Sequence, residues 1–241
     1  AGSQMPPLGL SENDVRLLTM YTLSLRRRDV PGNYLPRDRI RATRFGEREF
    51  ATDGATLFGT FCAGCHGLAG QGRKAPGMSA FPSIANPDFL GRASDHLIRE
   101  TIRKGRPGRR MSNWDRDGGL RPDEIEKLVV YLRSIGATPA PTETRPARWT
   151  AGDAASGKRL FEAACSGCHG MKGEGGEGPA LNNPVLLANA TDTYFVETIA
   201  RGRRGTAMVG FLEPSVVHGT LSRSEIESVV SHIRTWEGVK K

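Results

Sequence analysis

No apolar segment of this sequence is long enough to cross a membrane as a helix, which takes about 20 consecutive apolar residues. The N-terminus also lacks the charged and then apolar stretch of a signal peptide. We therefore expect either that an export signal has been removed or that the natural chain begins further upstream. Aromatic residues are few, at 7%, whereas 30 glycines and 15 prolines indicate many turns and loops. This composition disfavours one large sheet or bundle, and a length of 241 residues favours two small domains.

Acidic residues are the minority among the charged ones, with 26 Asp and Glu against 34 Lys and Arg and a formal net charge of +8. The excess positive charge bears on partners and solubility rather than on the fold. A basic chain could bind nucleic acid, but this sequence has neither basic stretches interleaved with aromatic residues nor a recognition motif. We therefore expect an acidic protein as the partner, and no nucleic acid.

Cysteine is scarce as well, and all four cysteines fall in two copies of one pattern. The copies are Cys62-Ala63-Gly64-Cys65-His66 and Cys165-Ser166-Gly167-Cys168-His169. In a Cys-x-x-Cys-His motif the two thiols add across the two vinyl groups of a haem, and the adjacent histidine reaches the iron as its proximal ligand. Four cysteines could instead form a zinc site or two redox dithiols, but zinc does not require a histidine directly after each second cysteine. The motifs thus predict two covalently bound haem c groups, each with its iron.

The two motifs resemble those of the class I cytochrome c family, and the resemblance covers two copies from about Asp53 to the C-terminus. It implies an all-α fold of two tandem cytochrome c domains, each with a few helices around a covalent haem. It also implies His and Met axial ligands and one-electron transfer, so we expect neither catalysis nor a small-molecule substrate. Because haem attachment in that family occurs outside the cytoplasm, the resemblance implies the periplasm or the outer face of the cytoplasmic membrane.

The two halves also match outside the cysteine motifs, as an internal repeat should. Before each motif, Gly54, Leu57 and Phe58 recur as Gly157, Leu160 and Phe161, at an offset of 103 residues and with helical spacing. After it, Pro82, Asn86 and Pro87 recur as Pro179, Asn183 and Pro184, at an offset of 97. The same offset continues without a gap through Asp95/Asp192, Glu100/Glu197, Thr101/Thr198, Ile102/Ile199, Gly105/Gly202, Arg106/Arg203, Gly108/Gly205 and Met111/Met208.

Met111 and Met208 occupy equivalent places, each after a short helix and a loop rich in Gly and Arg, where the cytochrome c family has its distal ligand. We expect their thioether sulfurs to bind the two irons opposite His66 and His169. Such a ligand raises the reduction potential relative to a second imidazole. The alternative role of a methionine is to fill a gap in a core.

Other histidines and methionines have weaker claims to a ligand role. His96 and His218 could complete a site with two histidine ligands, but neither has a counterpart in the other half. His232 takes the place of Tyr131 on the last helix, so we expect it to pack. Met78 and Met171 are expected to be packing or surface residues.

The resemblance further implies that the carbonyl oxygens of Pro82 and Pro179 accept the outer N–H of His66 and His169. Such a contact fixes the orientation of the ligand ring. Pro76 competes with Pro82 for this role, and the prolines could instead serve only to form turns.

Each half ends in an amphipathic helix with a glycine stop, Gly136 in the first and Gly238 in the second. Ser222 and Glu225 predict a capping box at the start of the second of these helices. The resemblance implies that this helix crosses the first helix of its domain, with a small glycine and aromatic rings at the crossing. The candidates are Gly54, Phe58 and Tyr131 in the first half, and Gly157, Phe161 and Trp236 in the second.

The N-terminal residues repeat the pattern of this last helix once more, from Met5 to Leu25, with no haem motif before it. One hypothesis is that the chain is the C-terminal part of a trihaem protein in which Met5 is a distal ligand. The alternative is an amphipathic helix over residues 11–28 that packs elsewhere. The predicted organisation is this tail over 1–25, a basic linker over 26–50, cytochrome c domain 1 over 51–136, a Pro-rich linker over 137–150, and cytochrome c domain 2 over 151–241.

The predicted function is electron transfer between redox partners, as a free carrier or, as the N-terminal tail favours, within a respiratory or dehydrogenase complex at the membrane. Basic residues before the two methionines are expected to surround the haem edges and attract an acidic redox partner, or else to be ordinary solvated surface. They are Arg103, Lys104, Arg106, Arg109, Arg110, Arg201, Arg203 and Arg204. The rival function is a dihaem enzyme such as a cytochrome c peroxidase, which needs an open iron position and an acid–base group above it.

Overall fold

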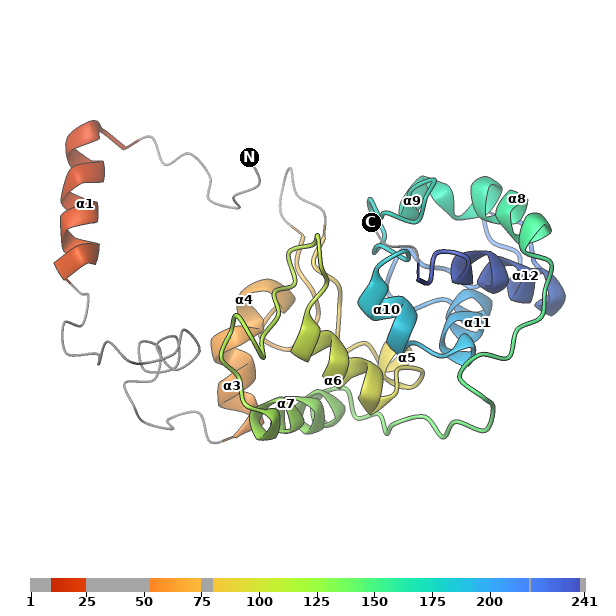
Figure 1. The fold of residues 1–241 in the computed structure, drawn as a ribbon, viewed down its shortest axis with the longest axis horizontal. Coiled ribbons are helices and arrows are strands. Elements are labelled where there is room, and N and C mark those ends of the chain that lie inside the picture. The colour runs from red at the N-terminus through yellow and green to blue at the C-terminus, as the bar shows by residue number, and fades with distance from the viewer. Residues whose placement is uncertain (1–9, 25–52, 75–79, 217, 239–241) are drawn as a thin grey trace. The chain divides into compact units, whose positions relative to one another are not determined.

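Regular structure in the part of the chain that the structure describes is helical, and the only β-type pairings there are two isolated bridges, Arg73 with Phe81 and Gly202 with Val209. The predicted all-α fold is confirmed. The chain divides into two compact units, Ala1–Arg48 and Glu49–Lys241. The computed structural model describes residues 10–24, 53–74, 80–216 and 218–238 (Figure 1).

The described residues of the first unit form one helix, α1 (Glu12–Ser24). Ser11 caps this helix, because its hydroxyl oxygen accepts a hydrogen bond from the backbone N–H of Asp14 at 3.2 Å. The match of α1 to the last helix of an upstream domain stays a prediction. Met5 and the linker over 26–50 lie outside the described residues.

The second unit contains both cysteine motifs, and its two halves have the same order of helices (Figure 1). In the first half these are α3 (Gly54–Phe61), α4 (Ala63–His66), α5 (Pro87–Leu90), α6 (Asp95–Lys104) and α7 (Pro122–Ile135). In the second they are α8 (Ala154–Ala164), α9 (Ser166–His169), α10 (Pro184–Asn189), α11 (Asp192–Arg201) and α12 (Arg223–Arg234). The internal repeat found in the sequence is thus a repeat of structure, whereas the predicted domain boundaries stay predictions.

The helix before each cysteine motif starts at an aspartate cap, and the position of that cap sets its length. In α3, the Asp53 carboxylate accepts a hydrogen bond from Thr56 N at 2.9 Å. In α8, the Asp153 carboxylate accepts from Ala155 N at 3.1 Å and from Ser156 N at 3.0 Å. Since the caps are offset by 100 residues and the cysteine motifs by 103, α8 is three residues longer.

The first and last helices of domain 1 cross at Gly54, as predicted. A Cβ at this position would lie 2.6 Å from the Cβ of Tyr131 on α7, so no larger residue fits without movement. The rings of Phe58 and Tyr131 fill the crossing with their centroids 5.3 Å apart. Packing at this point fixes the helix that leads into the first cysteine motif.

The crossing in domain 2 follows the same plan, with one more ring. A Cβ on Gly157 would overlap the carbonyl oxygen of Ser228 on α12. The Phe161 ring lies 5.3 Å from Trp236 and 5.6 Å from His232, centroid to centroid. His232 is buried among these rings, which confirms its packing role.

The last helices confirm two predicted boundaries and correct a third. The capping box of Ser222 and Glu225 is present in α12, and Gly136 ends α7. The predicted stop at Gly238 was wrong for the α-helix, which ends at Arg234. The chain continues as a tighter turn with hydrogen bonds to the third residue back, and Gly238, at φ 82°, follows it.

An arginine on each last helix ties three segments of its domain together, which the sequence did not predict. Arg133 donates to the Asp95 carboxylate at 2.8 Å, to Leu90 O at 2.5 Å and to Ala93 O at 2.6 Å. In domain 2, Arg234 donates at 2.7 Å to each of Asp192 Oδ1, Leu187 O and Ala190 O. The planar guanidinium thus holds the start of α6 or α11 against the last helix.

Candidate haem sites

His66 ends the short helix α4, directly after the two cysteines of the first motif. Its backbone N–H donates to Cys62 O at 2.9 Å, and the chain leaves the turn through Gly67 at φ 82°, a conformation that favours glycine. Its ring Nδ1 donates to Pro82 O at 2.9 Å. The predicted contact is confirmed, and it leaves Nε2 as the ring nitrogen available to a metal. Pro76, the competing proline, lies outside the described residues.

His169 repeats this arrangement at the end of α9. Its Nδ1 donates to Pro179 O at 2.8 Å, and Gly170, at φ 80°, follows it. Gly178 is close packed against the imidazole, since a Cβ there would lie 2.8 Å from His169 Cε1. Both rings are therefore held in one orientation by the carbonyl of a proline.

Both imidazoles are in an environment that favours the neutral, metal-binding form. Burial lowers the pKa of His66, and the hydrogen bond to Pro82 O acts against it without reversing the direction. Burial also lowers the pKa of His169, with a further lowering from the positive charge of Arg203. The rings are thus uncharged at neutral pH.

None of the four cysteines forms a disulfide in the structure. Burial, followed by the neighbouring cysteine, raises the pKa of Cys62 to about 12 and that of Cys165 to about 11. Uncharged sulfur is favoured at these places, and a thioether bond to a vinyl carbon satisfies that preference. Among the described residues no three His, Cys, Asp or Glu side chains are grouped to hold a metal, so the two motifs do not meet in one zinc site.

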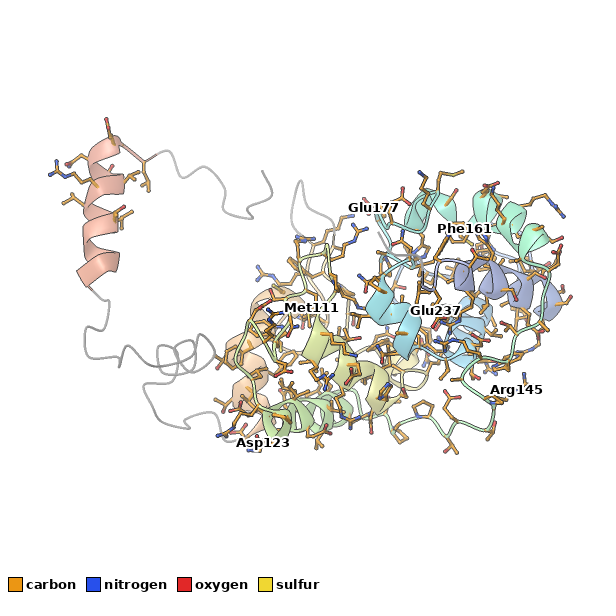
Figure 2. All side chains as sticks on the ribbon, in the orientation of Figure 1. Met111, Asp123, Arg145, Phe161, Glu177 and Glu237 are labelled. Carbon is orange, nitrogen blue, oxygen red and sulfur yellow. The ribbon has the colours of Figure 1, made fainter. Side chains whose placement is uncertain are left out.

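Met111 and Met208 lie on loops of the same construction, after α6 and α11. Arg106 N donates to Met111 O at 2.8 Å, and Arg203 N donates to Met208 O at 2.6 Å. Gly105 adopts φ 65°, and a Cβ there would lie 2.5 Å from Met111 O. Figure 2 shows the Met111 side chain on its loop. The structure thus makes the two methionines equivalent, and their binding to iron stays a prediction.

The side chains of each half suit a haem c. Each half offers two cysteine sulfurs directly before an imidazole whose Nδ1 is held, and a methionine on a closed loop. In the second half, His218 stacks on Phe211 with centroids 3.8 Å apart, and its buried Nε2 has no hydrogen-bond partner among the described residues. An unsatisfied polar atom of this kind fits a group with oxygen atoms at its edge.

The remaining ligand candidates have other contacts. His96 Nε2 lies 3.0 Å from Asn189 Oδ1 in the other domain. Met171 is 58% exposed, which confirms it as a surface residue. Met78 lies outside the described residues.

Part of the predicted basic surface is neutralised within the chain. Glu100 pairs with Arg103 at 3.3 Å and with Lys104 at 2.7 Å, while Glu197 pairs with Arg201 at 2.8 Å. Arg110 lies over the Phe81 ring at 4.1 Å, and Arg204 pairs with Asp88 of domain 1 at 3.0 Å. Arg109 lies on the loop before Met111 and is exposed, as are five of the other basic residues: Arg103, Lys104, Arg110, Arg201 and Arg204.

Both halves match models of known families. Residues 51–136 match the family described as "Cytochrome c", and residues 152–233 match "Cytochrome C oxidase, cbb3-type, subunit III". The chain is similar to the cbb3-type cytochrome c oxidase subunit FixP of Bradyrhizobium diazoefficiens, with 34% identity over 176 residues. That match covers 68% of this chain and 56% of the relative.

A second relative is the cbb3-type cytochrome c oxidase subunit CcoP of Rhodobacter capsulatus, 29% identical over 197 residues, or 77% of this chain and 62% of the relative. The chain therefore spans somewhat more than half the length of these relatives. A solved reducing HAO-like protein complex of Kuenenia stuttgartiensis aligns with a TM-score of 0.46 at 19% identity, over 76% of this chain and 95% of that one. A likeness this low supports no conclusion. Within the described residues, no helix is long and apolar enough to cross a membrane.

Proposed function

The chain belongs to the cytochrome c family, with two tandem cytochrome c domains and two covalently bound haem c groups, and we propose that it delivers electrons to a cbb3-type oxidase. Electron transfer follows from the two haem domains. The specific role as an oxidase subunit is supported by the match of residues 152–233 to subunit III and by the FixP and CcoP relatives. We place the chain outside the cytoplasm, in the periplasm or at the membrane face, as the resemblance implied.

The residues that hold the haems in this proposal are those of the two motifs and the two equivalent methionines. Cys62, Cys65, Cys165 and Cys168 would form the thioether bonds, and His66, His169, Met111 and Met208 would hold the irons. A haem c held in this way supplies an iron that takes up and releases one electron.

The chain contributes rigidity to this reaction. The bonds from His66 to Pro82 O and from His169 to Pro179 O keep each ring in one orientation whether or not an electron is present. The closed loops before Met111 and Met208 do the same for the thioethers. A site that is already ordered needs little rearrangement when its charge changes. The single observation that carries electron transfer is this equivalent pair of histidine sites, each directly after its two cysteines.

The ligands can be tested by optical spectroscopy on the haem-loaded chain. Met111→Ala and Met208→Ala should each remove about half of the near-infrared band that reports charge transfer from sulfur to iron. The exposed Met171→Ala is the matched control and should leave the band intact. If either ligand variant retains the full band, the assignment is wrong at that position, and an open or bis-histidine iron would favour a peroxidase-like enzyme.

The oxidase role needs a second experiment. The reduced chain is mixed with a cbb3-type oxidase from which the FixP or CcoP subunit has been removed, and oxygen uptake is recorded. Uptake should be restored by the wild type and not by Met208→Ala. Failure of the wild-type chain to restore uptake would contradict the oxidase role while leaving electron transfer in place.

A further inference from the structure

The two haem domains contact one another through a reciprocal pair of asparagines. Asn86 Nδ2 of domain 1 donates to Arg204 O of domain 2 at 2.9 Å. Asn183 Nδ2 of domain 2 donates to Pro107 O of domain 1 at 3.2 Å. Both donors and both acceptors are equivalent at the offset of 97 residues, so each domain presents the same asparagine to the same loop of the other.

Further contacts hold the loop 202–204 of domain 2 against domain 1. Arg204 makes three hydrogen bonds to the Asp88 carboxylate, at 2.8 to 3.1 Å. Arg92 donates to Gly202 O, and the Arg203 guanidinium lies 5.0 Å from the Phe89 ring centroid. The loop that precedes Met208 is therefore an interface between domains rather than a free docking surface.

Two guanidinium groups at this contact have no carboxylate partner among the residues that the structure describes. The Arg106 guanidinium makes one hydrogen bond within the described residues, to Thr101 Oγ1 at 3.4 Å, and burial lowers its pKa, with the nearby charge of Arg203 adding to the effect. Arg203 donates to the Tyr194 hydroxyl at 2.6 Å, and its Nε is buried without a hydrogen-bond partner among the described residues. Neither arginine forms an ion pair within the described part of the chain.

Two like charges that are partly shielded from water and close together are unfavourable unless an anion accompanies them. Arginine presents a planar fork that matches a carboxylate with two parallel hydrogen bonds. Arg203 is also close enough to His169 for its charge to act on the imidazole, which places the cluster beside the second haem site. The anion that this cluster lacks is therefore one that arrives with the haems, whose propionate groups are carboxylates.

We propose that Arg106, Arg203 and Tyr194 form a carboxylate-binding site shared by the two domains, which takes haem propionate groups and raises the reduction potentials of both haems. This inference rests on the proposed electron-transfer function, because it concerns the potentials at which the electrons move. Positive charge close to an iron stabilises its reduced state. A site that lies between the domains acts on both irons at once and makes their potentials depend on one another.

The test uses the haem-loaded full chain with Arg106→Gln and Arg203→Gln, each of which removes a charge and keeps a polar amide. The matched control is Arg109→Gln, an exposed arginine of the same loop. In a spectroelectrochemical titration each cluster variant should lower the equilibrium constant for reduction of both haems about tenfold, which is about 59 mV for one electron. Arg109→Gln should change this equilibrium constant little. Arg106→Lys keeps the positive charge and should leave the constant close to its wild-type value.

The identity of the carboxylate is read from redox-difference infrared spectra of protein whose haem propionates carry a ¹³C label. The bands that move in Arg106→Gln should be those that shift with the label. Unlabelled bands, or potentials that follow the inorganic phosphate concentration at constant ionic strength, would overturn the proposal in favour of another anion. A change confined to one haem, or an equal change in Arg109→Gln, would overturn the shared site. The sulfur-to-iron band tests electron transfer separately from all of these outcomes.

Discussion

Arg234 and Asp192 form an ion pair at 2.7 Å in which both side chains are nearly excluded from water, with exposed fractions of 12% and 2%. The same carboxylate accepts hydrogen bonds from Trp149 N at 2.7 Å and from Thr150 N at 2.8 Å. Trp149 and Thr150 belong to the segment that enters domain 2 from the linker. One buried carboxylate therefore connects the linker, α11 and α12.

Replacing that carboxylate should destabilise domain 2 strongly. Asp192→Asn removes the buried counter-charge of Arg234 and leaves it with the more exposed carboxylate of Glu237, at 3.2 Å, which should cost about 3 kcal/mol. The matched control is Asp95→Asn, which breaks the equivalent pair with Arg133 in domain 1. Because the Asp95 side chain is 44% exposed, water replaces the lost interaction there, and the cost should be about 1 kcal/mol.

Urea unfolding followed by circular dichroism measures both costs. If Asp192→Asn lowers the free energy of unfolding less than Asp95→Asn does, burial is not what makes the Arg234–Asp192 pair important.

The same carboxylate makes stability depend on pH in a defined direction. Burial acts to raise the pKa of Asp192, but the hydrogen bonds from Thr150, Trp149 and Arg234 outweigh it and hold that pKa below its usual value. The contribution of a group with a depressed pKa is fully present above the unfolded value of about 3.9 and is lost as the pH falls through the lower folded value. The stability difference between wild type and Asp192→Asn should thus be constant from pH 7 to pH 5 and shrink below pH 4, in urea titrations at each pH. A difference that grows on acidification would contradict this.

Two glycines of α3 should respond in opposite ways to the same substitution. Gly54→Ala places a methyl group against Tyr131 at the helix crossing and should cost about 1 to 3 kcal/mol. Gly59→Ala meets no atom within 4 Å and should stabilise the helix by about 0.5 to 1 kcal/mol. Thermal denaturation of the two variants checks both signs, and a destabilising Gly59→Ala would show that α3 is not a regular helix at that point.

The asparagine contact can be separated from the asparagine cap. Asn86 Oδ1 accepts from Asp88 N at 3.0 Å and from Phe89 N at 3.1 Å, which caps α5, while Nδ2 crosses to Arg204 O. Asn86→Asp keeps the acceptor and loses the donor, so α5 should remain and the contact between domains should weaken by about 0.5 to 1.5 kcal/mol. Calorimetry should show the two domains melting further apart in temperature.

A suitable control for that variant is Asn182→Asp, which removes a hydrogen bond to Lys172 O inside domain 2. An equal separation of the two transitions in the control would show that the effect is not specific to the domain contact.

The local parts of each site could be predicted from sequence because they depend on short spacings. The two cysteines and the histidine of each motif lie on one turn of chain, and the resemblance to the cytochrome c family implied the proline partner of each ring. The same resemblance implied the helix crossing at Gly54, where the structure leaves no room for a larger residue. These features need no knowledge of how the domains meet.

The arginine ties at Arg133 and Arg234 were missed because the offset between the halves changes after Met111. Asp95 and Asp192 are 97 residues apart, whereas Arg133 and Arg234 are 101 apart. The structure locates the insertion, since Leu120 N bonds to Trp114 O at 2.8 Å and Leu221 N to Phe211 O at 2.7 Å, which closes a longer loop in domain 2. The contact between domains was missed for another reason: the pattern shows that Asn86 and Asn183 are equivalent but not that each reaches across.

The reciprocal asparagine contacts have the form of an isologous interface, in which one patch binds a second copy of itself. Two separate copies of a single-haem domain could make both contacts at once, with a two-fold axis between them. The tandem chain therefore has the geometry that a homodimer would retain after duplication and fusion of its gene. The proline-rich linker would then add covalent connection to an association that the domain surface already encoded.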